Sequence, residues 1–422
     1  MKLKNLFSIC MLTQLFFGCG NSEPSVSDAD MSKIVLESPE YVRTEPGQTV
    51  EFKLNTSGIP GLKYTWKCEG EQFSSEKNPT FEVEKHGLFN IEVVVEDAAG
   101  KTKKLESQIF AAKKHDYKTV MYFPSWKDYT GDDWDKITHI CLCFGEVKSD
   151  GVINVDDVKA NLSKTITKAH ENGVCVLLSL GGGSETNGFT EALLNEGARK
   201  KISQSAVKII KDLKLDGIDV DYERWDYNGS EDDLKKSTEL EKLYKELSEA
   251  LTPEDCLLSA AISASYISFG AIKEPMIQYL DFVNFMIYDK TGPWSGSNVG
   301  PHSDWDFFIS TMDIAKSINI PDSKIITGVP FYGYKFKSPT DAEGAEAIAY
   351  SDIVSTYPGA EDKNEISEDL IYYDGKPAVR EKALYVKDNK LGGIMAWEIT
   401  QDSGDKSKSL LVVIDEILET SR

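Results

Sequence analysis

The sequence is short of basic residues and histidines, and its cysteines lack the pairing of a disulfide-rich protein. Its 47 lysines and arginines are outnumbered by 69 aspartates and glutamates, which leaves a net charge of −22 at pH 7. This excess of negative charge argues against nucleic acid or an anionic membrane surface as a partner. The five histidines have no ligand-like spacing, and no cysteine pair has zinc-finger spacing. The sequence therefore implies no metal and no cofactor.

The cysteines are expected to be free thiols. Cys141, Cys143 and Cys175 lie inside apolar runs, where cysteine behaves as a small buried hydrophobe. Cys141 and Cys143 are two residues apart on one expected strand, which is not a geometry for a disulfide. We therefore expect mostly buried thiols and no disulfide framework.

The first residues resemble a targeting segment. The apolar run over residues 6–17 follows two lysines and is too short for a stable membrane anchor. Gly18-Cys19 and the polar residues after them resemble a bacterial lipoprotein cleavage box. We expect residues 1–18 to be a signal peptide and Cys19 to carry a lipid, which would hold the chain at the outer membrane or cell surface. An ordinary secretion signal is the alternative, because Phe16 stands where leucine is usual.

A chain of 422 residues exceeds one typical core, so two domains are expected after a polar tether at residues 19–32. Residues 33–112 show short alternating runs separated by turn residues, which predicts a small all-β antiparallel sandwich with Trp66 between its sheets. This part resembles an immunoglobulin-like module of the PKD type, with residues 97–100 matching its last hairpin. We favour a spacer role for it over carbohydrate binding, and the second possibility stays open.

Residues 117–422 alternate apolar strands with helix-length segments. The expected helices include residues 161–172, 197–213, 231–251 and 307–318, and the third has an apolar stripe. Eight buried strands alternating with helices predict an α/β fold, a (β/α)8 TIM barrel with its active site at the carboxyl ends of the strands. The expected strands are residues 120–123, 137–144, 174–180, 217–223, 257–262, 282–288, 325–330 and 393–397.

The fourth of these strands carries the sequence DGIDVDYE over residues 216–223. Successive side chains of a strand point to opposite faces, so Asp219, Asp221 and Glu223 share one face, about 6–7 Å apart. Carboxylates this close raise the pKa of at least one of them. A neutral acid beside an ionised one is what cleavage of a glycosidic bond requires. A calcium site is the rival interpretation, but the stretch lacks the glycine and oxygen-rich turn of a calcium loop.

Motifs at the ends of other strands extend this pattern. They are SLGGG at 179–183, MIYD at 286–289, GVPFYG at 328–333, MAWE at 395–398 and YFPSW at 122–126. Several matches in the expected order are far more specific than any one of them. Together these motifs resemble glycoside hydrolase family 18, the chitinase family, from residue 117 to the end of the chain.

The resemblance implies a retaining hydrolysis in which the substrate's own 2-acetamido oxygen attacks the anomeric carbon and forms an oxazolinium ion. Glu223 would protonate the glycosidic oxygen and then activate water. Asp221 would orient the acetamido group, and Asp219 would hold Asp221 and share a proton with it. Tyr288 would hydrogen-bond the acetamido oxygen. Asp216, out of phase with the other acids, is expected to be structural.

The same resemblance places eight further residues around the sugar. Trp397 is expected to form the apolar floor under the distorted ring, because pyranose rings present C–H faces that stack on aromatic side chains. Trp294 would form a neighbouring subsite, and Gly182 would belong to a tight turn beside the acids. The remaining predicted binding residues are Asp289, Met286, Tyr122, Tyr332, Gly182, Trp294 and Glu398.

Three functions remain open at this point. The first is hydrolysis of β-1,4-linked N-acetylglucosamine in chitin or chitooligosaccharides, by a monomer. The second is an endo-β-N-acetylglucosaminidase that cuts the chitobiose core of N-glycans, which Tyr222 disfavours because such enzymes often have a small or acidic residue there. The third is a sugar-binding barrel without activity, which the presence of Glu223 disfavours. Residues 337–390 also look too short for the α+β insertion of deep-grooved relatives, which predicts an open cleft, and Lys335 stands where arginine is common.

Overall fold

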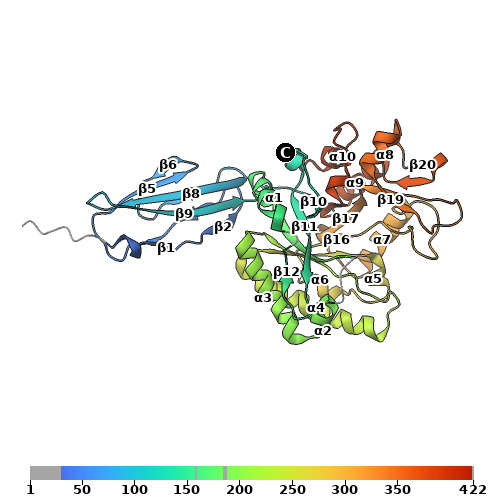
Figure 1. The fold of residues 1–422 in the computed structure, drawn as a ribbon, viewed down its shortest axis with the longest axis horizontal. Helices are drawn as coiled ribbons and strands as arrows, with labels where there is room; N and C mark the ends of the chain where they lie inside the picture. The colour runs from blue at the N-terminus through green and yellow to red at the C-terminus, as the bar shows by residue number, and fades with distance from the viewer. Residues whose placement is uncertain (1–29, 157–158, 184–187, 421–422) are drawn as a thin grey trace, which may run out of the picture.

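The computed structural model describes residues 30–156, 159–183 and 188–420, which form an N-terminal β module followed by an α/β barrel (Figure 1). The predicted signal peptide and Cys19 lie outside the described residues. No helix in the described ranges is long and apolar enough to cross a membrane.

The barrel consists of eight parallel strands in the described part of the chain, as predicted. The first strand pairs with both the second and the last, so the sheet closes on itself. A short antiparallel strand, β12 (Ile153–Asn154), is added beside the second. In ring order the parallel strands are β10 (Lys118–Pro124), β11 (His139–Val147), β13 (Cys175–Gly181), β14 (Gly217–Asp221), β15 (Leu257–Ile262), β16 (Phe282–Phe285), β17 (Ile325–Pro330) and β22 (Gly393–Trp397).

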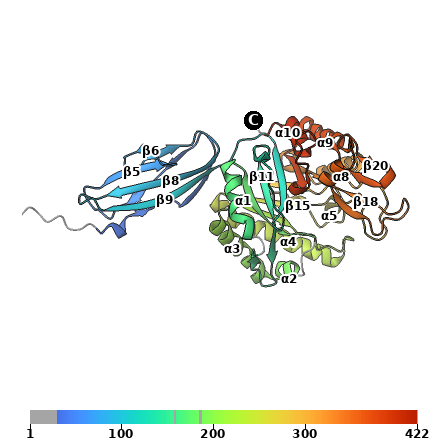
Figure 2. The same cartoon turned by 45° about the horizontal axis from the view of Figure 1, so that its top comes forward.

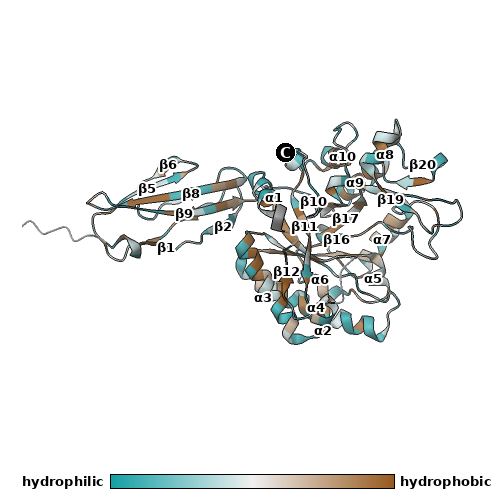
Figure 3. Ribbon diagram, viewed as in Figure 1, coloured by the Kyte–Doolittle hydropathy of each residue, from teal (hydrophilic) through white to brown (hydrophobic). Residues whose placement is uncertain are grey.

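Helices cover the outside of the barrel, and their ribbons carry both hydrophobic and hydrophilic residues (Figure 3). In the longest of them, the predicted stripe of Leu240, Leu243, Tyr244 and Leu247 is fully buried, and Ser230 Oγ caps the first turn by accepting from Asp233 N at 3.1 Å. The helices are α1 (Lys159–Glu171), α2 (Gly188–Leu194), α3 (Glu196–Leu213), α4 (Glu231–Leu251), α5 (Ala264–Ser268), α6 (Glu274–Ile277), α7 (Trp305–Ser317), α8 (Tyr350–Thr356), α9 (Lys376–Asp388) and α10 (Leu410–Leu418). Short 3-10 turns are η1 (Met31–Lys33), η2 (Asp133–Lys136), η3 (Thr252–Glu254), η4 (Asp322–Lys324), η5 (Ala360–Asp362), η6 (Ser367–Asp369) and η7 (Ile399–Gln401).

The N-terminal module is built from β strands alone apart from η1. Its main sheet has the order β2-β9-β8-β5-β6, and β1-β4 and β3-β7 form two smaller pairs. Trp66 is buried in its core against Phe52, as predicted. The β2–β9 pair is parallel, so the main sheet is mixed and not purely antiparallel. The strands are β1 (Val35–Leu36), β2 (Tyr41–Thr44), β3 (Thr49–Glu51), β4 (Leu54–Asn55), β5 (Lys63–Cys68), β6 (Glu71–Ser74), β7 (Thr80–Glu82), β8 (Gly87–Glu96) and β9 (Thr102–Ala111).

The module contacts the amino-terminal end of the barrel through a buried polar junction. Arg43 of β2 donates from Nε to Asp216 Oδ1 at 3.1 Å, and its other nitrogens reach the carbonyls of Leu215 and Glu254. His170 Nε2 donates to Asp216 Oδ2 at 2.8 Å, and Tyr41 OH lies 3.2 Å from His170 Nδ1. Asp216 is therefore structural, as predicted, because its oxygens join the two parts of the chain.

A small antiparallel sheet follows β17 on the opposite side of the barrel from the module (Figure 2). Its order is β19-β18-β21-β20, with α8 packed beside it. The sequence predicted that residues 337–390 are too short for an α+β insertion, and this was wrong, because strands this short show no clear alternation. These strands are β18 (Tyr332–Lys335), β19 (Glu346–Ala349), β20 (Glu365–Ile366) and β21 (Ile371–Tyr373).

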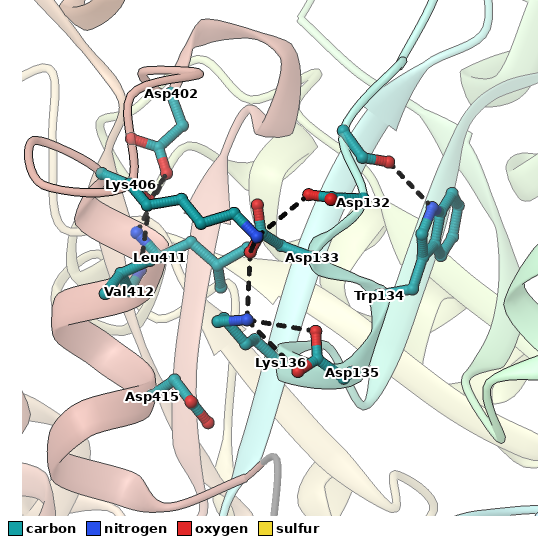
Figure 4. A network of polar contacts seen from close by, with 12 residues as sticks. Asp132, Asp133, Trp134, Asp135, Lys136, Asp402, Lys406, Leu411, Val412 and Asp415 are labelled. Atoms are coloured by element: carbon teal, nitrogen blue, oxygen red, sulfur yellow. Dashed lines mark hydrogen bonds and ion pairs between the residues drawn. The ribbon is translucent and has the colours of Figure 1, made fainter.

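Ion pairs join the segment after the first barrel strand to the segment after the last (Figure 4). Lys406 Nζ lies 3.2 Å from Asp132 Oδ1 and 3.5 Å from Asp133 Oδ1. Asp402 accepts from the N–H of Leu411 at 3.0 Å, at the start of α10. These contacts hold α10, the last helix, against the rim of the barrel.

Candidate active site

Asp219 lies inside the barrel and is surrounded by neutral hydrogen-bond donors. Its carboxylate accepts from Ser259 Oγ at 2.6 Å, Ser179 Oγ at 2.7 Å, Tyr122 OH at 3.0 Å and Asn284 Nδ2 at 3.2 Å. Burial raises the pKa of Asp219, and these four hydrogen bonds oppose the rise. The four donors come from four different strands, so barrel closure alone brings them together.

Asp221 and Glu223 lie above Asp219 at the carboxyl end of β14. Asp221 is the last residue of the strand and is buried, and Glu223 follows two residues later, where the regular strand has ended. The predicted strand, which ran to residue 223, is therefore two residues too long. Burial, and to a smaller extent the negative charge of Asp289, raises the pKa of Glu223 to about 7, against the opposing effect of Arg224. Glu223 is thus poised to hold a proton near neutral pH.

A cavity of about 300 Å³ opens above these acids at the carboxyl ends of the strands. The predicted Glu223, Asp221, Tyr288, Asp289, Met286, Tyr122, Tyr332 and Trp397 all line it. Four lining residues were not among the predicted site residues: Trp126, Phe144, Gly183 and Ala261. Phe144 and Ala261 lie at or near the ends of barrel strands, so the strand-end rule was the available signal for them.

One side of the cavity is aromatic. The rings of Trp397 and Phe144 are stacked at 18° with centroids 5.9 Å apart, and Tyr122 lies 5.9 Å from Trp397 at a tilt. Trp126 continues this surface 6.2 Å from Phe144, and its side chain is 63% exposed. The aromatic surface therefore extends from the cavity floor out to solvent.

The opposite side of the cavity is polar. Asp289 Oδ1 accepts from Tyr332 OH at 2.5 Å and from Tyr334 OH at 3.0 Å. The ring of Tyr288 lies 6.2 Å from that of Tyr332, with its edge toward it. Tyr288, Asp289 and Tyr332 thus form one wall.

Glycines after β13 make room for the acids and the aromatic floor. A Cβ on Gly183 would lie 3.3 Å from Glu223 Oε1, and one on Gly182 would lie 2.6 Å from the ring of Phe144. Gly182 also has φ of +88° and donates its N–H to the carbonyl of Asp221 at 2.8 Å. The predicted Gly182 therefore packs against Phe144 behind the cavity wall, and Gly183 lines the cavity itself.

Two other predicted binding residues lie outside the cavity. Glu398 is buried, with its carboxylate 2.7 Å from Lys127 Nζ and bonded to the Thr400 N–H at 2.9 Å, so its geometry supports the chain and not a sugar. Trp294 is 40% exposed and packs at 90° against Tyr334, 6.1 Å away, so it stands outside the wall.

Two residues used to compare relatives also lie away from the cavity. Lys335 is exposed on the outer face of β18, so Tyr334 is the residue of this strand that reaches Asp289, together with Tyr332. Tyr222 is buried in the layer outside the barrel, with its hydroxyl 2.8 Å from Thr190 Oγ1. Its bearing on substrate choice is therefore indirect.

An acid with a raised pKa, two further carboxyls on one strand and an aromatic floor define the site of a glycoside hydrolase. Residues 118–402 match glycosyl hydrolases family 18, so the chain belongs to this family and is a chitinase-like glycoside hydrolase.

Related proteins agree with this assignment. The chain is 26% identical over 370 residues to probable chitinase 10 of Drosophila melanogaster, covering 72% of this chain but only 16% of that relative. A chitinase from Bacteroides thetaiotaomicron has a similar structure, with TM-score 0.63 and 27% identity over 72% of this chain and 97% of that one. The chitinase ChiB from the chitin utilization locus of Flavobacterium johnsoniae has TM-score 0.61 and 29% identity over 72% of this chain and 94% of that one.

Proposed function

We propose that the enzyme hydrolyses β-1,4 bonds of chitin or chitooligosaccharides with retention of configuration. The observation that carries this proposal is the raised pKa of Glu223, in a cavity of about 300 Å³ with an aromatic floor. A carboxyl that keeps its proton near neutral pH can protonate a leaving glycosidic oxygen. The names of the relatives support chitin as the substrate class.

The positions of the three acids support the following reaction. Glu223 donates its proton to the glycosidic oxygen while the acetamido oxygen of the substrate attacks the anomeric carbon, so the bond breaks and an oxazolinium ion forms. Glu223, now ionised, takes a proton from water, and the water oxygen opens the ring. Asp221 orients the acetamido N–H and balances the developing positive charge. Asp219, with its raised pKa, shares a proton with Asp221.

The aromatic and polar walls supply the binding contacts. Trp397 and Phe144 present a flat apolar surface to the C–H face of the distorted sugar. Tyr288 donates a hydrogen bond to the acetamido oxygen. Asp289, on the same wall as Tyr288, faces the same sugar. Aromatic stacking of this kind contributes about 0.5–1.5 kcal/mol for each well-placed ring.

Replacement of the acid tests this proposal. Glu223→Gln should lower kcat at least about 1,000-fold while chitooligosaccharide affinity stays within about threefold of wild type, because only the proton donor is lost. Glu231→Gln, an exposed acid at the start of α4, is the matched control and should keep full activity. Product analysis by mass spectrometry follows both variants.

The choice of substrate separates the alternatives. De-acetylated chains and cellulose should not be cleaved, because the nucleophile belongs to the N-acetyl group, and their efficient hydrolysis would refute the mechanism. Faster release from a high-mannose glycopeptide than from chitooligosaccharides would instead favour the endo-β-N-acetylglucosaminidase. Sugar binding without turnover of either substrate would identify a binding protein.

We also propose that the enzyme acts as a monomer held at the cell envelope by a lipid on Cys19, with the N-terminal module as an immunoglobulin-like spacer. The lipoprotein-like box and the all-β composition of the module support this arrangement. Labelled fatty acid should be incorporated by the wild type and not by Cys19→Ser. Recovery of unlabelled wild type from the medium would refute the anchor.

A further inference from the structure

Asp289 is an anion held by neutral groups. Its Oδ1 accepts from the hydroxyls of Tyr332 and Tyr334, whose side chains are 6% and 7% exposed, while 44% of the Asp289 side chain remains exposed. Its backbone has φ of +62°, a conformation that L residues adopt at an energetic cost and that fixes the direction of the side chain. Across the described ranges, no lysine or arginine forms an ion pair with Asp289.

His302 lies beside this carboxylate. It is buried, and its Nε2 lies 3.2 Å from the carbonyl oxygen of Tyr332. Its Nδ1 lies 3.4 Å from the backbone nitrogen of Asp289 and 3.5 Å from Asp289 Oδ1. The imidazole therefore helps to position Asp289.

The nearest cations are directed elsewhere. Alternation along β18 points Tyr332 and Tyr334 inward and Lys335 outward. Lys290 follows Asp289 directly, but its Nζ is paired with Asp304 at 2.5 Å. The strand therefore presents a phenol to Asp289 at position 334, where a longer basic side chain would reach it equally well.

We propose that Tyr334 is a positioning residue, whose hydroxyl fixes the Asp289 carboxylate on the cavity wall without bringing a positive charge to it. This inference rests on the proposed function, since it concerns the setting of the acid Glu223. The ring of Tyr334 also packs against His302 at 5.0 Å and against Trp294 at 6.1 Å. Tyr334 therefore links the charged wall of the cavity to the exposed tryptophan outside it.

The negative charge of Asp289 has a direct effect on the acid Glu223. Asp289 raises the pKa of Glu223, so a cation at position 334 would offset that effect and release the proton at lower pH. Among the described residues, Arg224 is the group that lowers the pKa of Glu223. The other titratable groups facing this part of the cavity are Asp221, Tyr227, Tyr266, Tyr288, Tyr332 and His302.

Carboxyl ¹³C NMR of protein labelled in glutamate tests the inference without requiring turnover. The Glu223 signal is assigned by its loss in Glu223→Gln. Tyr334→Arg should move the Glu223 titration down by about one pH unit, which is about a tenfold change in its proton affinity. Lys335→Gln, which changes the net charge by one on the outer face of the same strand, is the matched control and should move it by less than about 0.2 unit. Both are measured at about 0.15 M salt, where distant charges are screened.

Tyr334→Phe tests the hydroxyl separately, and it decides the matter if Tyr334→Arg does not fold. It keeps the ring and its packing but removes one donor to Asp289. It should lower kcat/KM for chitooligosaccharides about threefold to tenfold with the melting temperature unchanged. An unshifted Glu223 titration in folded Tyr334→Arg, or full kcat/KM in Tyr334→Phe, would overturn the inference. Absence of turnover in the wild type, with the Glu223 titration still shifted by Tyr334→Arg, would refute the proposed function and leave this inference standing.

Discussion

The two ends of β14 carry the same kind of residue in opposite surroundings. At its foot, Asp216 is met by a cation, Arg43, and by the donors His170 Nε2 and Val176 N. Further along the strand, Asp219 accepts hydrogen bonds from hydroxyls and an amide in the described part of the chain, and beyond the carboxyl end Glu223 has a raised pKa. An aspartate paired with arginine serves as a structural anchor. Carboxyls buried among neutral groups hold protons and can exchange them.

This comparison also explains where the N-terminal module docks. Arg43 of the module supplies the cation that makes the foot of the catalytic strand structural. The module contacts the end of the barrel opposite to the cavity, so it leaves the mouth open. The contacts and the chemistry therefore occupy separate ends of one strand.

The largest predicted effect comes from removing the contacts of Asp216 at the foot of β14. Asp216→Ala leaves Arg43 Nε, His170 Nε2 and the Val176 N–H without their acceptor, and should lower the free energy of unfolding by about 3–5 kcal/mol. Urea denaturation measures this loss, and kcat of the protein that remains folded should stay close to wild type. A large fall in kcat at unchanged stability would instead assign Asp216 to the catalytic group.

The second prediction concerns the carboxyl of Asp219, inside the barrel. Asp219→Asn removes the buried carboxyl and turns one of its two acceptor oxygens into a donor, which then faces either Ser179, the partner of Oδ2, or Ser259, the partner of Oδ1. It should lower kcat about 10–100-fold, which is about 1.4–2.7 kcal/mol in the activation barrier, with a smaller change in stability than at the foot. Steady-state kinetics and melting curves on the same preparation make the comparison. A stability loss as large as that of Asp216→Ala would remove the distinction between the two ends.

The third prediction concerns pH. The pKa of Glu223 is raised from its ordinary value of 4.5 to about 7 in the folded protein, so unfolding releases a proton between these values. The folded state therefore loses stability as the pH rises through this window, and activity falls as the acid loses its proton near pH 7. Glu223→Gln should become more stable than wild type by about 1–2 kcal/mol between about pH 5 and about pH 8. Parallel stability profiles for the two proteins would contradict the raised pKa.

The smallest predicted effect is at the exposed end of the aromatic surface. Trp126→Ala should raise KM for long chitooligosaccharides about threefold to tenfold and leave short ones nearly unaffected, because it removes one stacking contact far from the acids. Its stability should change by less than about 0.5 kcal/mol, since the side chain is 63% exposed. Leu384→Ala, an exposed apolar residue on α9, is the matched control. Equal KM changes for short and long substrates would place Trp126 elsewhere.

Much of the barrel could be read from the sequence. All eight strands were located within a few residues, because buried parallel strands appear as short apolar runs that are visible locally. The acids of residues 219–223 were found for the same reason, since a two-residue period puts them on one face whatever surrounds them. The small sheet after β17 was underestimated, because its two- to four-residue strands are too short to show a period.

Sequence alone thus determined the barrel, the catalytic strand and the order of its acids, because these depend on short-range periodicity and on motifs at strand ends. Tertiary structure alone decided which side chains contact one another. Arg43 pairs with Asp216, and Lys127 pairs with Glu398. Tyr334, and not Lys335, donates a hydrogen bond to Asp289, and Phe144 stacks on Trp397. These contacts join residues far apart in the chain, and the physical effect of each depends on burial and distance, which no local pattern contains.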